Sequence, residues 1–177
     1  YEGTNGIQAI DLIGRKQLMN SGQSMQYFID QIKTTISEAS SVEGIEALVE
    51  SVSQALARFE SLSTEMAARM TSEKRLNALS FAHPFLEVTG DITFAWMHLW
   101  RASIAAPKLM KKAGTLDAQA VQQAAAKNKD AAFYAGQMAS ARFFIQTLLP
   151  STLGKMQAIM DGSTCVEEMA DASFGSK

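Results

Sequence analysis

FAHPFLEVTGDITFAWMHLWRASIAAPKLM, residues 81–110, is the stretch that decides the fold class of this chain. Its apolar residues recur every three or four positions, which is the period of an α-helix, and from Ile92 to Ile104 they occupy more than one face. A helix that is apolar on several faces is buried among other helices. The stretch therefore predicts the central helix of the molecule, within a helical segment over about residues 76–112.

Local signals limit this central helix at both ends. Pro84 predicts either the first turn of a helix that begins near His83 or a kink inside a longer one, because proline lacks an N–H and clashes with the preceding turn. Lysines near the other end complement the negative end of the helix dipole. Gly114 then predicts the C-terminal stop.

A short amphipathic helix is predicted at the start of the chain, over about residues 5–19. Thr4 or Asn5 can cap it, because either side chain can accept a hydrogen bond from a first-turn N–H. Residues 20–22, Asn-Ser-Gly, stop it. The isoleucines expected on one side of this helix are Ile7, Ile10 and Ile13.

Three more helical segments are predicted from apolar stripes. The second helix covers about residues 25–39, and Ser40 and Glu43 have the spacing of a capping box that starts a third helix ending near Met70. An alanine-rich helix follows over about 117–149. Together the stripes predict an all-α fold, an antiparallel bundle of long amphipathic helices.

The C-terminal part of the sequence is more polar. Pro150 is expected to bend or restart the chain, and Gly162 to end the last helix. Residues 163–177 are expected to be loosely held, with Met169 and Phe174 as anchors.

Composition excludes several classes of protein. The 177 residues are 47% hydrophobic and 19% charged, which is typical of a globular chain and not of a disordered one. A net charge of −2 gives no basic footprint for nucleic acid or an anionic membrane. No apolar run reaches the roughly 20 residues of a membrane span. The single cysteine, Cys165, cannot form an internal disulfide, so a soluble protein of a reducing compartment, the cytoplasm, is expected.

The bundle lacks the motifs of metal and phosphate chemistry. Neither His83 nor His98 follows a glutamate by three residues, which excludes the di-iron pattern, and no metal site is expected. Both histidines are interpreted as packed or capping residues. Trp96 and Trp100 are interpreted as core or subunit contacts. The acidic cluster of the tail is interpreted as a solvated face, and its members are Glu167, Glu168 and Asp171.

The opening residues carry a family resemblance. YEGTNGIQ, residues 1–8, resembles the catalytic segment of the acyl-CoA dehydrogenases, in which a Tyr-Glu-Gly-Thr run precedes the last helix of the C-terminal helical domain. IDLIGRK, residues 10–16, follows at the expected place. Residues 82–105 and 128–156 resemble the additional C-terminal helical domain of a bacterial subgroup, the 3-methylmercaptopropionyl-CoA dehydrogenase-like enzymes.

The resemblance implies a division of the chain and a set of roles for its first residues. Residues 1–20 would be the catalytic segment and last helix of the dehydrogenase C-terminal domain, and residues 21–177 the additional bundle, with a structural role. Glu2 matches the general base that removes a proton next to the thioester carbonyl while a hydride leaves the next carbon for the flavin. Desolvation raises the pKa of a carboxyl group, which suits it to this role. The backbone N–H of Glu2 would donate to the thioester oxygen.

Other residues of the opening segment would contact substrate and cofactor. Gly3 would let the substrate pass close to the backbone. Thr4, Asn5 and Gly6 match positions that touch FAD, at the N-terminus of a helix. Position 6 is glycine where many family members have glutamine, so this position lacks that side-chain contact.

The resemblance also implies cofactors and partners for the complete enzyme: FAD, an acyl-CoA substrate, an acceptor of the electron-transfer flavoprotein type, and a homo-oligomer. The fragment alone is expected to be inactive and not to bind FAD. The alternative is a free-standing helical interaction or oligomerisation module in which the YEGT letters are accidental. Codons upstream of Tyr1 discriminate between the two, because only the enzyme requires them to encode a dehydrogenase core.

Overall fold

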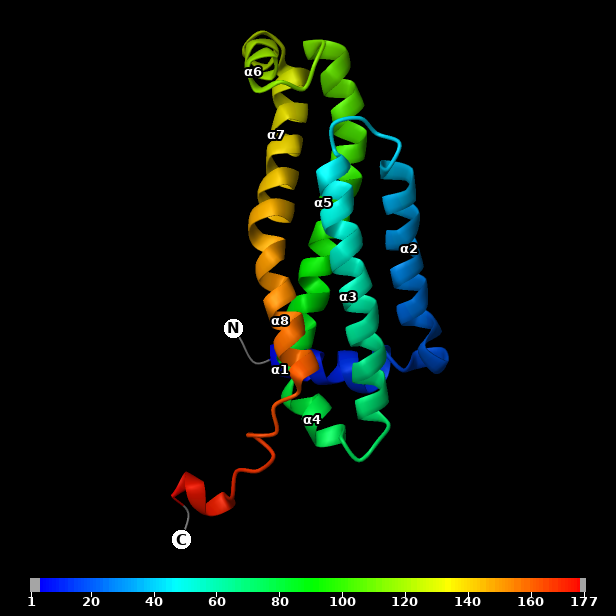
Figure 1. The fold of residues 1–177 in the computed structure, drawn as a ribbon, viewed down its shortest axis with the longest axis vertical. Coiled ribbons are helices and arrows are strands. Elements are labelled where there is room, and N and C mark those ends of the chain that lie inside the picture. The colour runs from blue at the N-terminus through cyan, green and yellow to red at the C-terminus, as the bar shows by residue number, and fades with distance from the viewer. Residues whose placement is uncertain (1–3, 176–177) are drawn as a thin grey trace.

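The fold is seen in a computed structural model that describes residues 4–175, and within this range the regular elements are helices with no strand. Four long rods run antiparallel, up-down-up-down (Figure 1). The rods are α2 (Gln23–Ala39), α3 (Glu46–Met70), α5 (Ala82–Ala113), and α7 (Lys129–Phe143) continued by α8 (Leu149–Asp161). The predicted all-α fold is confirmed.

The predicted central helix is α5, which contacts each of the other rods. Pro84 is its third residue, so the first-turn interpretation of this proline is confirmed, and Gly114 ends the helix with φ 80°. Its second apolar face is only partly covered: the exposed side chains there are Phe94, Trp100 and Ile104. The face turned to the other rods is buried, and its residues are Ala82, Phe85, Val88, Ile92, Ala95, Leu99, Ala102, Ala105, Ala106 and Leu109.

An aromatic cluster joins three of the rods at the centre of the bundle. The rings of Phe59 and Phe85 stack with centroids 5.9 Å apart, and Phe28 meets Phe59 edge-on at 6.3 Å. Trp96 meets Phe28 edge-on at 5.9 Å, and its indole N–H donates to Thr35 Oγ1 at 2.7 Å. Trp96 therefore has the core role expected from the sequence, with its polar atom satisfied.

The turn between α2 and α3 differs from the sequence prediction. The hydroxyl of Ser40 donates to the carbonyl of Ile36, so it does not cap α3, and α3 begins only at Glu46. The chain turns instead at Gly44, with φ 85°, and the N–H of Gly44 donates to Glu46 Oε1 at 2.9 Å. The positive φ of Gly44 favours glycine here, and a Cβ would in addition require the end of the Leu116 side chain to shift.

The predicted helix over 117–149 is interrupted at Asn128. The residue has φ −140° and ψ 117°, and it separates α6 (Ala118–Lys127) from α7. Its side-chain Oδ1 accepts from the N–H groups of Asp130 and Ala131, both at 3.0 Å. Asn128, a residue type that favours the N-cap position, was the sequence signal for this interruption, and apolar periodicity alone does not reveal it.

Two π-helical segments connect other elements. The segment η3 (Phe144–Leu148) joins α7 to α8 just before Pro150, which occupies the first turn of α8. Proline needs no hydrogen-bonding N–H in that position, so the two helices continue as one rod (Figure 1). Of the two expectations for Pro150, restart of the helix is the one observed, and Gly162 ends α8 with φ 62° as expected.

The other π-segment, η1 (Leu12–Lys16), follows the first helix, α1 (Asn5–Asp11). The chain then turns through the 3-10 segment η2 (Met19–Gly22), in which Asn20 and Ser21 have positive φ values of 51° and 57°. The first helical segment therefore ends at Lys16, before the predicted end near Met19, and the chain changes direction at the predicted residues 20–22.

The foot of the bundle is closed by Arg69, whose exposed fraction is only 7%. Its Nε pairs with Glu65 at 2.7 Å, while Nη1 and Nη2 donate to the carbonyls of Ile159 and Met160, each at 2.8 Å. Nη1 also donates to Asn77 Oδ1 at 3.2 Å. Arg69 thus links α3 to the end of α8 and to α4 (Arg75–Ser80).

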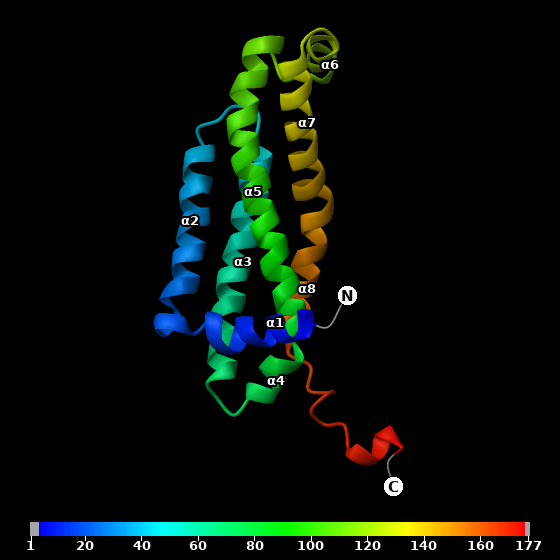
Figure 2. The same cartoon turned by 180° about the vertical axis from the view of Figure 1, so that it is seen from behind.

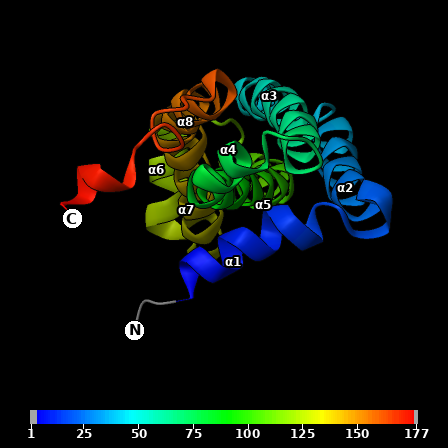
Figure 3. The same cartoon turned by 90° about the horizontal axis from the view of Figure 1, so that it is seen from below.

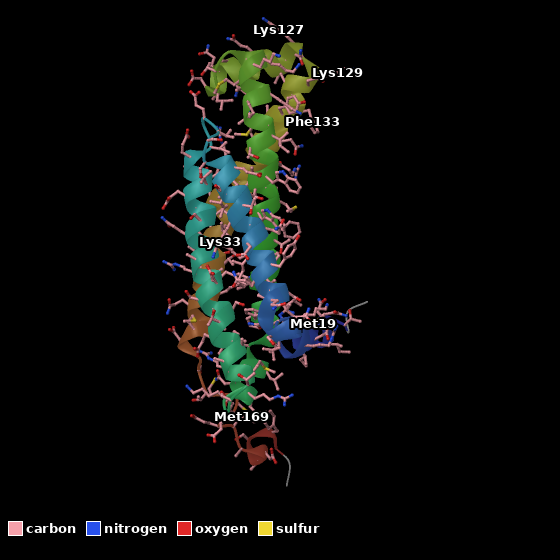
Figure 4. All side chains as sticks on the ribbon, turned by 90° about the vertical axis from the view of Figure 1, so that its right-hand side faces the viewer. Met19, Lys33, Lys127, Lys129, Phe133 and Met169 are labelled. Atoms are coloured by element: carbon pink, nitrogen blue, oxygen red, sulfur yellow. The ribbon has the colours of Figure 1, made fainter. Side chains whose placement is uncertain are left out.

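The tail extends away from the foot of the bundle and ends in the 3-10 segment η4 (Asp171–Phe174), with Met169 in its course (Figure 4). Met169 is 49% exposed and Phe174 is 74% exposed. The expectation that these two side chains anchor the tail was wrong, because neither is buried against the bundle.

Candidate functional site

The described part of the predicted site lies at the beginning of α1. Glu2 and Gly3 lie outside the described residues, whereas Thr4, Asn5 and Gly6 lie together in the cap and first turn, all exposed. The carbonyl of Thr4 accepts from the N–H of Gln8 at 2.8 Å, but the Thr4 side chain makes no capping hydrogen bond. A Cβ at Gly6 would meet nothing within 4 Å, so the surroundings of this turn are open.

α1 lies across the lower part of α5, on the side away from α3 and α8 (Figures 2 and 3). Ala9 and Ile13 are fully buried, and Gln17 is 2% exposed. These three residues are spaced by four, so they form one buried stripe along α1 and η1. The N–H of Gln17 donates to the carbonyl of Leu12 at 2.8 Å, five residues back, so the segment makes a π-turn just before Gln17.

Gln17 is a polar anchor at the end of this stripe. Its amide Nε2 donates to the carbonyl of Ser63 on α3 and to the Ser63 hydroxyl, the latter at 3.2 Å. Only Nε2 is paired, since Oε1 is buried without a hydrogen-bond partner among the described residues. The Nε2 contact favours one register of the segment, because breaking it would leave a further buried polar group unpaired. The segment before α2 is therefore held to the bundle by packing and by a hydrogen bond.

A neighbouring side of α1 is apolar and uncovered. Ile7 is 65% exposed and Ile10 is 53% exposed. The prediction that Ile7, Ile10 and Ile13 share one side was wrong, because the buried stripe is formed by Ala9, Ile13 and Gln17. On the polar flank, hydrogen bonding to Arg15 and then to Lys16 lowers the pKa of Asp11.

A second cluster joins α5 to the π-segment η3. The ring of His98 stacks on that of Phe144 with centroids 5.0 Å apart, and the ring centroid of Phe94 lies 5.9 Å from that of Phe144. His98 Nδ1 is buried and has no hydrogen-bond partner among the described residues. Burial, and secondly the charge of Arg101, lower the pKa of His98. The arrangement is that of a neutral packed imidazole, as the sequence interpretation expected.

His98 is expected to make the free energy of unfolding depend on pH. We expect His98→Phe to reduce the loss of stability between pH 7 and pH 5. The unfolded chain takes up a proton as the pH falls below about 6.5, whereas the folded imidazole resists protonation, so acid favours unfolding. Urea unfolding at both pH values measures the effect. His83→Phe, which removes an exposed histidine of the same helix, is the control; equal slopes for the two variants would contradict the expectation.

The remaining candidate residues do not form a second site. Among residues 4–175, no three His, Cys, Asp or Glu side chains are placed to hold a metal ion. His83 is exposed, with Nδ1 3.9 Å from Glu87. In the tail, Glu167 accepts from Asn77 at 2.6 Å, Glu168 accepts from the hydroxyl of Thr164 at 2.6 Å, and Cys165 is an exposed free thiol. No helix of the described chain has the length and apolar character required to span a membrane.

Comparison with known proteins gives one family match. The family model described as "Acetyl-CoA dehydrogenase C-terminal like" matches residues 28–170. Two butyryl-CoA dehydrogenases of Syntrophomonas wolfei are 29% and 27% identical over 95% and 98% of this chain, and over 26% of their own length in each case. A 3-methylmercaptopropionyl-CoA dehydrogenase of Ruegeria pomeroyi is 28% identical over 91% of this chain and 25% of its own length. The chain spans about a quarter of the length of these relatives.

Proposed function

The chain belongs to the acetyl-CoA dehydrogenase C-terminal-like family, and from this premise we propose that it forms the C-terminal part of a flavin-dependent acyl-CoA dehydrogenase. The observation that carries the proposal is the similarity of almost the whole chain to three acyl-CoA dehydrogenases, each about four times as long. The reaction would be the α,β-dehydrogenation of an acyl-CoA thioester.

We propose that residues 1–20 contain the catalytic segment and the last helix of the dehydrogenase C-terminal domain. Residues 21–177 would form the additional bundle. The family match begins at residue 28, within α2, which supports assigning the bundle and the segment before it to different parts of the enzyme.

In this proposal Glu2 is the catalytic base. Its carboxylate accepts the proton from the carbon next to the thioester carbonyl. The backbone N–H of Glu2 donates to the carbonyl oxygen, which stabilises the negative charge that develops there as the proton leaves. Gly3 presents no side chain to the substrate, so the thioester can lie close to the backbone.

The groups exposed in the first turn of α1 are compatible with contacts to FAD at the edge of its site. The Thr4 side chain makes no capping bond, and the space around Gly6 is open, so a hydroxyl and a bare backbone are presented together. Thr4, Asn5 and Gly6 would hold the flavin through these groups. When bound, FAD supplies the acceptor for the hydride that leaves the β-carbon. The other walls of the site belong to the rest of the enzyme.

For the complete enzyme we propose an acyl-CoA substrate, an electron-transfer flavoprotein-type acceptor, a homo-oligomeric state and a cytoplasmic location. The relatives named for butyryl-CoA and 3-methylmercaptopropionyl-CoA place short acyl groups first in a substrate panel. The panel should test straight-chain and thioether acyl-CoAs of increasing length.

The proposal is tested by comparing two proteins. We expect the full-length protein to purify yellow and to oxidise at least one acyl-CoA of the panel with an artificial electron acceptor. The 177-residue chain is expected to purify colourless, because most contacts to the flavin lie outside it. Absorbance in the visible band of oxidised flavin, and acceptor reduction, are the measurements. A colourless full-length protein without activity would contradict the proposed function.

A further inference from the structure

We propose that α1 is a helix shared between two bodies: one side is packed on the bundle, and the neighbouring apolar side is covered by the flavin-binding body of the same polypeptide. Through α1, the bundle positions Glu2. This inference rests on the proposed function, and it gives the additional bundle a specific task in catalysis.

The first step is the rigid attachment of α1 to the bundle. Ala9 and Ile13 have no exposed surface, and the Gln17 amide donates to Ser63 on α3. Together they attach three successive turns of the segment to α5 and α3. A helix fixed at three points along one stripe moves with the bundle as one body.

The second step is the uncovered side of the same helix. Ile7 and Ile10 lie three residues apart, which places them on neighbouring positions of one face, and both are more than half exposed. Seen from the side, the N-terminal segment projects from the foot of the bundle near Met19 (Figure 4). Exposed apolar side chains grouped on one face of a helix are typical of a surface that binds another apolar surface.

The third step identifies what covers this face. The relatives are about four times as long as the chain, so a large body remains to be placed. The catalytic segment enters α1 directly: only Gly3 and Thr4 separate Glu2 from Asn5, and three residue steps span at most about 11 Å. A body that contributes the rest of the active site around Glu2 must therefore lie beside α1. Two isoleucines are too small an area for a stable contact between separate molecules, but a covalent connection supplies a high effective concentration.

The consequence is that residues far from the substrate determine where Glu2 lies. Proton transfer requires a base within hydrogen-bond distance of the proton, and a displacement of about 1 Å can reduce the rate by about 10²-fold. Gln17 is thus a positioning residue that acts on catalysis through α1 and has no contact with substrate.

Coverage of α1 is tested by cysteine labelling in the full-length protein. Ile10→Cys is treated with an iodoacetamide reagent, and labelled peptides are quantified by mass spectrometry. The exposed native thiol of Cys165 is the internal control. We expect Cys165 to label at least tenfold faster than the introduced thiol, with the difference abolished in denaturant. Equal rates would overturn the proposal. Protection that disappears on dilution, together with dissociation of an oligomer, would assign the cover to a second copy and would also overturn it.

Positioning is tested by Gln17→Met, which keeps the length of the side chain but removes its amide. Gln26→Met, at an exposed glutamine of α2, is the matched control. We expect about a tenfold lower kcat for Gln17→Met, with KM for acyl-CoA and the FAD content both within about twofold of the unsubstituted enzyme. A kcat equal to that of the control, or a change confined to KM or FAD content, would overturn the positioning role.

The two tests separate this inference from the proposed function. Labelling is read without any enzymatic activity, so it reports coverage of α1 even for a protein that oxidises no acyl-CoA. An active, yellow enzyme whose thiol introduced by Ile10→Cys labels as fast as Cys165 would leave the proposed function standing and remove the shared helix.

Discussion

In the full-length protein, under the proposed function, Glu2→Gln is expected to retain FAD and to lower kcat by about 10²–10⁴-fold. Glutamine keeps the size of the side chain and its backbone N–H, so the proposed contact to the thioester oxygen would survive. It lacks a group that can take the proton. Binding should therefore persist while the chemical step fails, with KM changed far less than kcat.

Exchange of the substrate's α-protons isolates the step assigned to Glu2. In D₂O, the unsubstituted enzyme is expected to exchange these protons, measured by NMR, and Glu2→Gln to lose the exchange. Glu43→Gln, at an exposed position of the loop before α3, makes the same chemical change far from the opening segment and should behave like the unsubstituted enzyme. Near-normal turnover in Glu2→Gln would remove this residue from the base role.

Much of the fold was predictable because the long helices bury one continuous stripe each. In α3, Leu48, Val52, Leu56, Phe59 and Met70 all lie at helical spacing, and all are buried. The pattern reports burial directly, because an apolar residue at each turn must be removed from water. The central position of α5 followed from the same reasoning, applied to more than one face.

The failed predictions concern features that a hydrophobic pattern does not encode. Asn128 interrupts the alanine-rich segment through side-chain hydrogen bonds to two backbone groups, and these outweigh the helical propensity of its neighbours. Ser40 is a residue type that often caps a helix, but its hydroxyl donates to the carbonyl of Ile36 at the end of the preceding helix. Each outcome depends on a local competition between hydrogen bonds.

At the candidate site, the motif around Glu2 predicts a catalytic base, and this stays a prediction because Glu2 lies outside the described residues. The attachment of α1 was missed because Gln17 is polar and was not counted in a stripe. The signal was present as the four-residue spacing of Ala9, Ile13 and Gln17.

The stability of the foot of the bundle is expected to depend strongly on Arg69. We expect Arg69→Ala to lower the free energy of unfolding by about 3 kcal/mol, since it leaves the carbonyls of Ile159 and Met160 and the side chain of Asn77 without a buried donor. Urea unfolding of the 177-residue chain, followed by circular dichroism, measures the change. Arg58→Ala, at an exposed position of the same helix, should change stability by less than about 0.5 kcal/mol.

Arg69→Lys separates the contribution of hydrogen-bond geometry to stability from the contribution of positive charge. Arg69→Lys keeps the positive charge, but a single ammonium cannot reach two carbonyls, Glu65 and Asn77 with the fixed fork of a guanidinium. We therefore expect lysine to recover less than half of the lost stability. Full recovery by lysine would show that the charge, and not the hydrogen-bond geometry, stabilises this end of the molecule.

The guanidinium also explains why glycine is required at position 162. With φ 62°, Gly162 ends α8 in a conformation that favours glycine, and a Cβ there would lie 3.0 Å from Arg69 Nη1. Gly162→Ala therefore has two costs, backbone strain and contact with Arg69, and only the second is removed in the Arg69→Ala background. The double mutant is expected to be more stable than the sum of the two single losses predicts. Arg69 Nη1 and Nη2 each lie 2.8 Å from a carbonyl oxygen at the end of α8, those of Ile159 and Met160. Simple additivity of the two losses would show that these contacts do not couple Arg69 to the end of α8.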